Sequence, residues 1–331
     1  MKVVIPLAGY GTRLRPHTYT RPKPLINIAG KPVLGHLLDK LSTLDISEYI
    51  FIVGYLGDQI EEYITEHQQV PAKYVVQQEM LGQSHAIYLA REHLTTDEPV
   101  FVVFGDHIFE TNFDLIKDGK HEAVIYVKEV DDPQRYGVVM LDNNRHIVKV
   151  VEKAAQPPTN LAVIGLYYIN SGRKLIDAID RQIKENKKTK NEYYIADALQ
   201  NLIDGGMKFD IEAVSDWLDC GSPELVLEAN RYLLSQGGKD NSHQLHFDNV
   251  IIIPPVRIDP TCRIQNSVIG PYVSIAAGCK IEWSIVRDSI VGEDAEIQNT
   301  LLESSLVGQN AFVKGQFTSF NVGDSSSVRF S

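Results

Sequence analysis

Residues 6–16, PLAGYGTRLRP, place two glycines, a threonine and two arginines directly behind an apolar run. Backbone N–H groups in a glycine turn can approach phosphate oxygens because no Cβ obstructs them. Arg13 and Arg15 add positive charge, and Lys23 follows between two prolines in RPKPL, which stiffen the segment so that ordering it costs little entropy. The stretch favours a site for a phosphorylated ligand over a plain tight turn, although it matches neither the G-x-G-x-x-G fingerprint nor the P-loop pattern.

The net charge of the chain limits what that ligand can be. With 43 Asp and Glu against 32 Lys and Arg, the 331 residues carry a formal charge of −11. This negative balance disfavours an extended positively charged surface of the kind that binds DNA or RNA. A polyanionic ligand must therefore meet a local cluster of cations, and we expect a small molecule.

Hydropathy and cysteine usage bear on where the protein works. No stretch approaches the roughly 20 apolar residues that span a bilayer, and the N-terminus MKVVIPLAGYG is too short an apolar run for a signal peptide. The three cysteines, Cys220, Cys262 and Cys279, form neither a CxxC pair nor a disulfide framework, which is typical of a reducing compartment. We expect a cytoplasmic protein with neither a membrane nor a nucleic-acid partner.

The elements that must position the glycine turn belong to an α/β domain. Up to about residue 236, β-branched runs such as KVVIPLA and VFVVFGD alternate with amphipathic segments such as VLGHLLDKLSTL. This alternation is typical of a mostly parallel sheet layered with helices. PELVLEANRYLLSQ predicts a closing helix, and residues 237–249 predict a linker. We therefore expect a domain over 1–236, the linker, and a second domain over 250–331.

The second domain is built from a short repeat. Segments beginning at residues 258, 275, 291 and 307 share the pattern [IV]-x-x-x-[AC]-x-[IV], which predicts a parallel β-helix of hexapeptide type, since one coil cannot bury its apolar face alone. Cys262 and Cys279 fall in the slot that Ala295 and Ala311 occupy. We interpret both cysteines as small core hydrophobes rather than redox or metal groups, and Cys220 has no assigned role.

At this point a family resemblance becomes specific. LAGYGTRLRP with RPKPL is similar to the N-terminal signature of sugar nucleotidyltransferases, the NDP-sugar pyrophosphorylases, which condense a nucleoside triphosphate with a sugar 1-phosphate and release pyrophosphate. Nearly the whole chain takes part, and it resembles the long-form glucose-1-phosphate thymidylyl- and uridylyltransferases. The implied fold is a Rossmann-like domain followed by a left-handed β-helix. The later family segments are FGDHIF at 104, RYGVV at 135, VVEK at 150, NEYYIAD at 191 and WLDCGSPELVLEA at 217.

The resemblance implies roles at the nucleotide. In-line attack on the α-phosphorus crowds negative charge onto the α-phosphate and the departing pyrophosphate. Catalysis is therefore mainly positioning of the reactants and neutralisation of that charge. Arg13 would neutralise the β- and γ-phosphates, and Lys23 would reach the α-phosphate or the leaving group. Asp106 and Asp219 would hold Mg²⁺, which prefers oxygen ligands; the plainer alternative for Asp106 is a helix cap or turn residue. The expected nucleotide-binding residues are Leu7, Ala8, Gly9, Gly11, Thr12, Gln77 and Gly82.

The resemblance also implies a sugar-phosphate side. Lys153 suits the phosphate of the sugar 1-phosphate, and Glu152 can accept hydrogen bonds from hydroxyls, although a surface ion pair would also explain the two. Tyr167 either lines this pocket or packs in the core. His17, His85 and His107 lie near motifs but receive no role, because this chemistry needs no general base. The remaining expected sugar-side residues are Gly137, Gly165 and Glu192.

The base loop, QQEMLGQSHA at 77–86, favours a pyrimidine. In the family a Gln five residues before a Gly is typical of pyrimidine users, and Gln77 and Gly82 have that spacing. An amide can both donate to and accept from the edge of uracil or thymine. GQSHA departs from the usual G-T-A-x-A, and Ala154 and Ala196 replace a proline and a threonine of other motifs. We expect dTTP or UTP with glucose 1-phosphate; the alternatives are a mannose-1-phosphate guanylyltransferase and a non-catalytic nucleotide-sugar-sensing subunit.

The β-helix is expected to serve packing or assembly rather than catalysis. Bifunctional relatives use a β-helix histidine as general base for acetyl transfer, and no histidine follows residue 247 here. The stack of coils needs a cap at its end, from residues 319–331 or from another subunit. We therefore expect a homo-oligomer formed through the β-helix.

Overall fold

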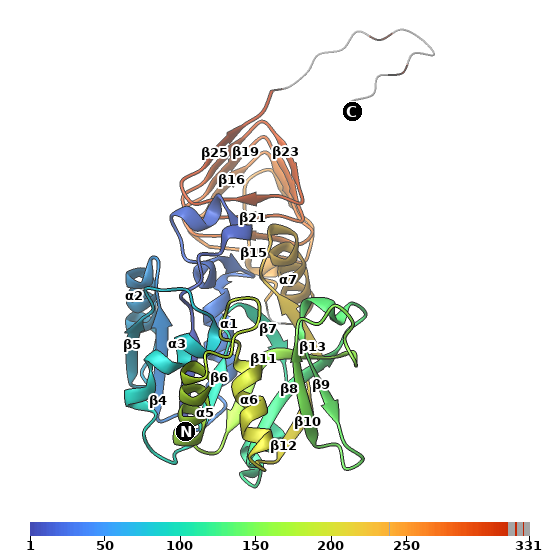
Figure 1. Ribbon diagram of the computed structural model, residues 1–331. Helices are drawn as coiled ribbons and strands as arrows, with labels where there is room; N and C mark the ends of the chain where they lie inside the picture. The colour runs from blue at the N-terminus through green and yellow to red at the C-terminus, as the bar shows by residue number, and fades with distance from the viewer. Residues whose placement is uncertain (238, 317–321, 323–326, 328–331) are drawn as a thin grey trace. The chain divides into compact units, whose positions relative to one another are not determined.

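The computed structural model describes residues 1–237, 239–316, 322 and 327 (Figure 1). The chain divides into two compact units. Unit 1 comprises Met1–Ile26 and Lys31–Leu225, and unit 2 comprises Asn27–Gly30 and the chain from Val226 onward. This division places the helix α7 (Pro223–Ser235) largely in unit 2. Our boundaries at 236 and 249 remain predictions, and the expected cap at 319–331 lies almost wholly outside the described residues.

Unit 1 is built on a nine-stranded mixed sheet, in the path order β10-β9-β11-β6-β1-β4-β5, with β8 paired to β11 and β12 paired to β8. The parallel half is β6-β1-β4-β5, and β11 runs antiparallel beside β6. The strands are β1 (Lys2–Pro6), β4 (Glu48–Val53), β5 (Ala72–Val76), β6 (Val100–Val103), β8 (Ala123–Glu129), β9 (Gly137–Leu141), β10 (Ile147–Glu152), β11 (Leu161–Ile169) and β12 (Phe209–Ala213).

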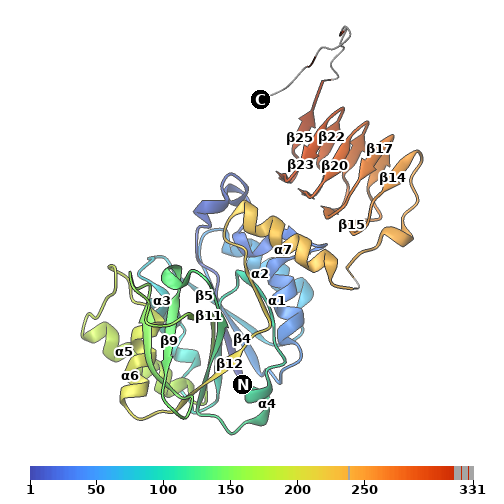
Figure 2. The same ribbon diagram turned by 90° about the vertical axis from the view of Figure 1, so that its right-hand side faces the viewer.

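Helices cover both faces of this sheet (Figures 1 and 2), so both sides of its central strands are apolar. On β1, Val4 belongs to one buried cluster, and Val3 and Ile5 belong to the other. Helix α5 begins with a cap, because Ser171 Oγ accepts a hydrogen bond from Lys174 N at 3.2 Å. The helices are α1 (Val33–Leu41), α2 (Gly57–His67), α3 (Gln83–Leu89), α4 (Asp114–Asp118), α5 (Gly172–Lys184) and α6 (Ile195–Asp204). None of the helices described in the chain is long and apolar enough to cross a membrane.

The strand order creates a crevice at the carboxyl end of β1. The chain passes from β1 to β4 and β5 on one side and then returns to β6 on the other. At such a switch point the loops after the two central strands diverge, and ligands of open α/β sheets bind there. The loop after β1 is the glycine turn, and the loop after β6 carries Phe104, Gly105 and Asp106. The expected Rossmann-like fold is confirmed.

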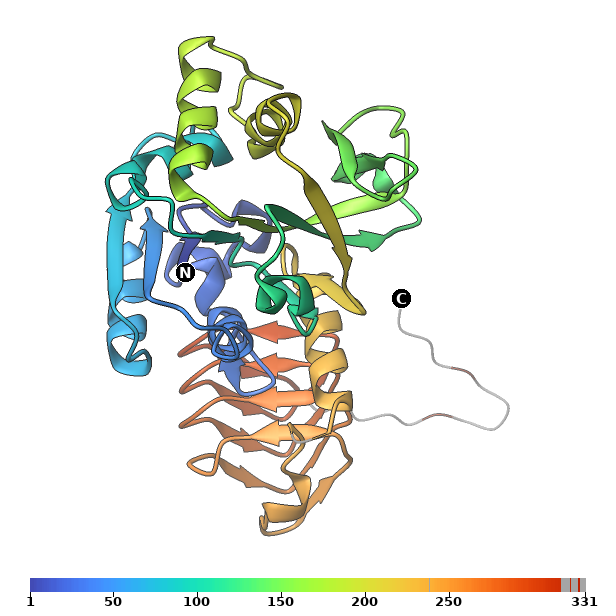
Figure 3. The ribbon, with the colours of Figure 1, turned by 90° about the horizontal axis from the view of Figure 1, so that it is seen from below.

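The core of unit 2 is a parallel β-helix, as predicted. Its strands form three parallel four-stranded sheets, stacked coil upon coil (Figures 2 and 3). Ile264, Ile281 and Ile297 lie in register in the interior, and Cys279 is as fully buried as Ala295. The sheets are β14 (Val250–Ile252), β17 (Ser267–Ile269), β20 (Ile285–Arg287) and β23 (Leu301–Glu303); β15 (Val256–Ile258), β18 (Val273–Ile275), β21 (Ile290–Val291) and β24 (Leu306–Val307); and β16 (Arg263–Gln265), β19 (Lys280–Glu282), β22 (Glu296–Gln298) and β25 (Phe312–Lys314).

A buried asparagine ties α7 to the β-helix and to the segment Asn27–Gly30 within unit 2. Asn230 Oδ1 accepts hydrogen bonds from Ala29 N at 2.9 Å and from Ser274 Oγ at 2.6 Å, and Asn230 Nδ2 donates to Tyr272 O at 3.1 Å. A fully buried amide must satisfy its polar atoms, so these contacts are specific rather than incidental. They explain why a four-residue piece from early in the chain belongs to unit 2.

We predict that none of the three thiols reacts rapidly in the folded protein. All three cysteines are free and buried, and burial raises the pKa of Cys220, which suppresses the reactive thiolate. A chromogenic disulfide reagent should release no colour from the native protein over minutes and should count all three thiols in 6 M guanidinium chloride. Rapid release of one equivalent from native protein would contradict the interpretation of these cysteines as inert.

Candidate active site

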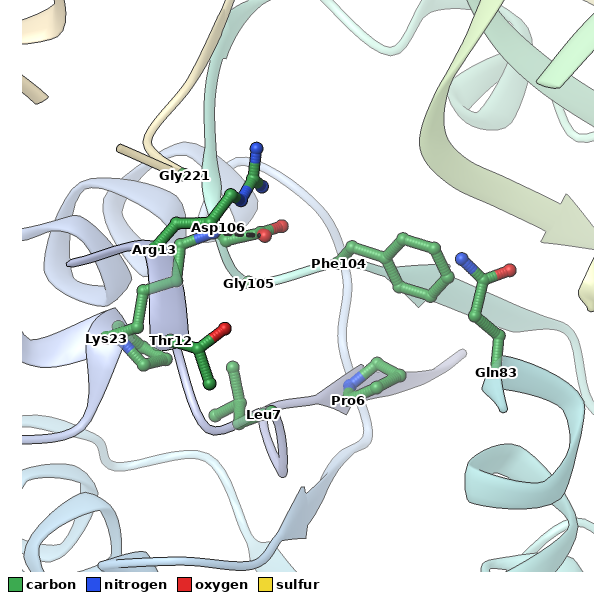
Figure 4. Close-up of a pocket in the computed structure, with 13 residues that line it drawn as sticks. Pro6, Leu7, Thr12, Arg13, Lys23, Gln83, Phe104, Gly105, Asp106 and Gly221 are labelled. Carbon is green, nitrogen blue, oxygen red and sulfur yellow. Dashed lines mark hydrogen bonds and ion pairs between the residues drawn. The ribbon is translucent and has the colours of Figure 1, made fainter. Parts of the chain in front are cut away.

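A pocket of about 340 Å³ opens at the crevice between the loops after β1 and β6 (Figure 4). Of the sequence-predicted residues, Leu7, Gly9, Gly11, Thr12, Arg13, Lys23 and Asp106 line it. Figure 4 shows Arg13, Lys23 and Asp106 together, with Phe104 and Gln83 on the opposite side. The pocket thus has a charged end and an end lined by an aromatic ring and an amide.

The glycine turn is shaped by its backbone. Gly11 has φ +62°, and a Cβ there would lie 3.0 Å from Thr18 Cγ2 and 3.1 Å from Lys23 Cβ. Glycine adopts this left-handed conformation without strain. A Cβ on Gly9, by contrast, would meet no atom within 4 Å. Packing does not demand glycine at position 9, so its bare backbone is available to a ligand in the pocket.

The charged end is an ion cluster centred on Lys23. Lys23 Nζ lies 2.5 Å from Asp106 Oδ2 and 3.9 Å from Asp219 Oδ1, and Arg13 Nη2 lies 3.9 Å from Asp219 Oδ2. The two aspartates meet because β13 (Asp216–Asp219) pairs antiparallel with β7 (His107–Glu110), which sets Asp219 opposite His107. Two cations therefore share two carboxylates.

The Asp106 carboxylate is held in its charged form. Burial by itself would raise the pKa of Asp106. The His107 imidazole, whose Nε2 lies 2.9 Å from Asp106 Oδ1, and the Lys23 ammonium outweigh that effect and hold the pKa well below its usual range. Asp106 is thus available as an anionic oxygen ligand across the physiological range.

The two carboxylates fit a divalent cation of the magnesium type. Asp219 Oδ1 is buried and has no hydrogen-bond partner, so one anionic oxygen of the cluster is unsatisfied. Over the described part of the chain, no group of three or more His, Cys, Asp or Glu could hold a metal. A cation that takes one or two carboxylates and fills its remaining positions with water and substrate phosphates needs no larger set. Asp106 and Asp219 are the residues that would hold it.

Of the predicted sugar-side residues, Gly137, Glu152, Gly165 and Tyr167 lie on β9, β10 and β11, and Lys153 directly follows β10. None of the predicted sugar-side residues lines this pocket. Glu152 lies opposite Gly137, where a Cβ would come 2.9 Å from Glu152 Oε2. Lys153 Nζ lies 3.8 Å from Glu152 Oε1 and 5.0 Å from the ring centroid of Tyr194. Burial raises the pKa of Glu152, and the ammonium of Lys153 opposes that rise. These residues form a second polar group of the same unit.

Gly165, Tyr167 and Glu192 have different surroundings. Gly165 has φ +82°, and a Cβ there would lie 2.7 Å from Phe104 Cδ2, so this glycine makes room for a ring that lines the pocket. Tyr167 is only 6% exposed and belongs to the buried core, where its ring contacts Phe104 at 5.9 Å between centroids. Glu192 is exposed. Tyr167 thus belongs to the core and does not line the pocket between the loops after β1 and β6.

The base loop is fastened to the segment that contains Glu192. Ser84 N donates to Tyr193 O at 2.8 Å, and Tyr193 N donates to Leu81 O at 2.9 Å. Gly82 has φ +114°, and a Cβ there would lie 2.6 Å from Tyr193 N. Gln77 is 5% exposed, and its Nε2 donates to Glu79 O at 3.2 Å. Neither Gln77 nor Gly82 lines the pocket; the residue of this loop that does is Gln83.

Comparison with known proteins now supplies the family. Residues 2–236 match the family described as nucleotidyl transferase. The chain belongs to this family. It is 34% identical to the UTP–glucose-1-phosphate uridylyltransferase AglF of Haloferax volcanii, over 70% of this chain and 96% of that protein. The predicted family and enzyme class are therefore confirmed: this is a nucleotidyltransferase of the sugar-1-phosphate class, a kind that generally uses a divalent metal.

Two further proteins, one of them of known structure, are similar to most of this chain. The bifunctional protein GlmU of Methanocaldococcus jannaschii is 35% identical over 78% of this chain, and the match spans 60% of that protein's length. A crystal structure of a Bacillus anthracis protein, assigned as a glucose-1-phosphate thymidylyltransferase and bound to sucrose, superposes with a TM-score of 0.61 at 27% identity. It covers 72% of this chain and 96% of that one.

Several residues of the nucleotidyltransferase pocket were missed from the sequence. Gly105 and Gly221 stand inside the FGD and WLDCG segments, and a Cβ on either would clash, at 2.1 Å from Leu7 Cδ2 and at 2.4 Å from Arg13 Nη2 respectively. Because these two glycines stand inside family motifs, the sequence was enough to predict that they line the site. No sequence pattern pointed to Gln83, because it stands where the expected loop pattern has threonine. Its Oε1 accepts a hydrogen bond from Ile195 N at 3.4 Å, which anchors a side chain that lines the pocket.

We predict that Gly82→Ala damages the nucleotidyltransferase far more than Gly119→Ala. Both glycines have positive φ, but a Cβ on Gly119 meets nothing within 4 Å, whereas one on Gly82 meets the backbone of Tyr193. Gly119→Ala should lower the free energy of unfolding by about 1–2 kcal/mol, the cost of the left-handed backbone. Gly82→Ala should lower it by about 2–5 kcal/mol, because overpacking is added. Urea unfolding measures both, and equal effects would contradict the Tyr193 contact.

Proposed function

We propose that this nucleotidyltransferase transfers a nucleotidyl group from dTTP or UTP to glucose 1-phosphate, with Mg²⁺ as the metal ion. An oxygen of the sugar phosphate forms a bond to the α-phosphorus of the triphosphate. The bond from that phosphorus to the bridging oxygen of the β-phosphate breaks, and pyrophosphate leaves. The observation that carries the proposal is the Lys23 cluster, which gathers two cations and two carboxylates at the charged end of the glycine-turn pocket.

The cluster suits phosphates because its partners can exchange. Lys23 pairs with Asp106 at 2.5 Å, and Arg13 Nη2 lies 3.9 Å from Asp219 Oδ2. When a triphosphate enters, Lys23 can turn to the α-phosphate and Arg13 to the β- and γ-phosphates, while the aspartates are released to the magnesium site. Bound there, the metal would supply charge neutralisation at the phosphate oxygens. The N–H groups of the turn at Gly9 and Gly11 complete the phosphate cradle.

The sugar 1-phosphate is assigned to the group on β9 and β10. Lys153 supplies a cation for its phosphate, and the Glu152 carboxylate accepts hydrogen bonds from sugar hydroxyls. Burial raises the pKa of Glu152 and the Lys153 ammonium opposes that rise, so the carboxylate is partly withdrawn from water beside a cation. The substrate's in-line approach to the α-phosphorus then requires both reactants to be held at once, which is the main source of rate in this chemistry.

Pyrimidine choice rests on amide side chains in the base loop. Gln77 and Gly82 keep the family spacing outside the lining of the pocket, and Gln83 is the residue of this loop whose amide lines it. An amide matches the mixed donor and acceptor edge of uracil or thymine, whereas the two adjacent donors of guanine suit a carboxylate. A cytoplasmic location is part of the same proposal, supported by three cysteines that are all free thiols.

Substrate choice is tested by pyrophosphate release from a panel of reactants. The four common ribonucleoside triphosphates and dTTP are each combined with glucose, mannose and N-acetylglucosamine 1-phosphates in the presence of Mg²⁺. We expect the highest kcat/KM with a pyrimidine nucleotide and glucose 1-phosphate. A clear preference for GTP with mannose 1-phosphate would establish the guanylyltransferase alternative. Absence of release with every pair would favour a non-catalytic sensor.

The metal assignment is tested by Asp219→Asn, which removes a charge with almost no change in shape. Turnover should fall by about 100-fold or more, as when one preorganised electrostatic group is lost, and more Mg²⁺ should be needed for half-maximal rate. Asp216→Asn, on the same strand β13, is the matched control and should leave both quantities within about twofold of the wild type. Unchanged kinetics for Asp219→Asn would remove this residue from the metal site.

A further inference from the structure

The carbonyl group of Gly11 is held from two directions inside the glycine turn. Leu14 N donates a hydrogen bond to Gly11 O at 2.9 Å, and Thr18 Oγ1 donates a second at 2.8 Å. The C=O and the N–H of a trans peptide point in opposite directions. The two bonds that fix Gly11 O therefore also fix the direction of the Thr12 N–H, which belongs to the same peptide unit.

The direction of that N–H matters because of where Thr12 lies. Thr12 begins the short 3₁₀ helix η1 (Thr12–Leu14), and the first N–H groups of a helix find no acceptor within it. Thr12 also lines the pocket (Figure 4). The orientation of the Gly11–Thr12 peptide thus decides whether the turn can donate to a phosphate oxygen in the pocket.

Thr18 contacts Gly11 from a buried position. It is only 2% exposed, and a Cβ on Gly11 would lie 3.0 Å from Thr18 Cγ2. The methyl group therefore packs against Gly11 while the hydroxyl group bonds to its carbonyl. A β-branched side chain is stiff about χ1, so one rotamer serves both contacts. The position of the Thr18 backbone then decides whether its hydroxyl reaches Gly11 O.

The backbone that follows Thr18 lies at the surface, where little packing holds it. Tyr19 is 54% exposed, and Thr20 is exposed as well. Two side chains from elsewhere in unit 1 hold their carbonyl groups: Tyr55 OH donates to Tyr19 O at 2.7 Å, and Gln59 Nε2 donates to Thr20 O at 3.0 Å. Tyr55 lies in the loop after β4, and Gln59 lies in the first turn of α2. We call these two side chains the latch.

We propose that the latch positions the glycine turn for the nucleoside triphosphate and that it acts through Thr18. Neither Tyr55 nor Gln59 lines the pocket, so an effect on the ligand must pass through the chain that they hold. The latch fixes two consecutive carbonyl groups, the backbone carries that restraint to Thr18, and the Thr18 hydroxyl passes it to Gly11 O. This inference rests on the proposed function, which assigns the triphosphate to the glycine turn.

A purely local role for Tyr55 is the alternative, because its ring centroid lies 5.9 Å from that of Tyr10. Tyr55→Phe keeps the ring and removes only the hydroxyl group, and Gln59→Met keeps the length of the side chain and removes only the amide. The double variant Tyr55→Phe/Gln59→Met, the latch variant, therefore breaks both hydrogen bonds with little change in packing. Gln69→Met is the matched control, the same change at an exposed glutamine just beyond α2.

Calorimetric titration of the full chain tests the latch without turnover. The four common ribonucleoside triphosphates and dTTP are titrated in turn with Mg²⁺ and without sugar phosphate, and the tightest ligand is kept. Its dissociation constant should rise by about 3–10-fold in the latch variant, as the modest net contribution of surface hydrogen bonds predicts. Gln69→Met should bind within about twofold of the wild type.

Two results of this titration would overturn the proposal. One is a latch variant that binds the triphosphate as tightly as the wild type. The other is a latch variant with fewer binding sites per chain and an unchanged dissociation constant, which would show that the two hydrogen bonds serve stability alone.

Kinetics separates the two substrates. The latch variant should raise KM for the triphosphate and leave KM for the sugar 1-phosphate within about twofold of the wild type. Equal increases in both KM values would overturn the proposal. A wild type that binds a triphosphate but releases no pyrophosphate would contradict the proposed function alone, because the dissociation constants would still decide the role of the latch. A wild type that binds no triphosphate would overturn both.

A double-mutant cycle tests the route through Thr18. Thr18→Val keeps the branched shape and removes the hydroxyl group, so it should weaken triphosphate binding by about tenfold, whereas Thr18→Ser should bind within about threefold of the wild type. If the latch acts through this hydroxyl, adding the latch substitutions to Thr18→Val should weaken binding by less than about twofold more. Factors that multiply, as they do for independent sites, would overturn this route.

Discussion

The arrangement of unit 1 depends on the compensation of charge around Lys23. In a protein of charge −11, a lysine ammonium within reach of two aspartates neutralises carboxylates that would otherwise repel each other and any phosphate. The His107 imidazole together with this pairing keeps Asp106 ionised in a place where burial would favour protonation. A site assembled in this way is ready for polyanions without displaying positive charge over the surface. This explains how an acidic chain can hold two phosphorylated reactants.

The fold supplies that cluster from segments that are far apart in sequence. Lys23 follows the turn after β1, Asp106 ends the loop after β6, and Asp219 ends β13. The switch in strand order opens the crevice, and the β7–β13 pairing fixes the distance between the two carboxylates. Glycines at 105 and 221 are required for the close contacts with Leu7 and Arg13. The geometry of the cluster is thus a consequence of sheet topology and of a few positions where a side chain would displace Leu7 or Arg13.

The parts of this structure that depend on local residue patterns could be predicted from the sequence. Alternating runs gave the α/β layers, and the repeat with its aliphatic and small positions gave the β-helix, because inward positions must be apolar in every coil. Gln83 could not be found in this way, since its position at the pocket is set by Ile195 from a distant helix. The placement of Asn27–Gly30 in unit 2 was equally hidden, because it depends on the long-range hydrogen bonds of Asn230. Buried polar contacts between remote segments leave no periodic trace in a sequence.

Outward positions of the β-helix carry information of another kind. The repeat constrains what points inward and leaves the outer sides free, so a difference among those sides reflects what each one meets. One side meets α7, one meets solvent through ion pairs, and one keeps exposed Ile251, Ile285 and Leu301 beside Trp283. Selection for solubility alone would have made the third side resemble the second. The outer sides of this β-helix, which carries no histidine after residue 247, therefore differ in chemistry in a way that its buried repeat does not require.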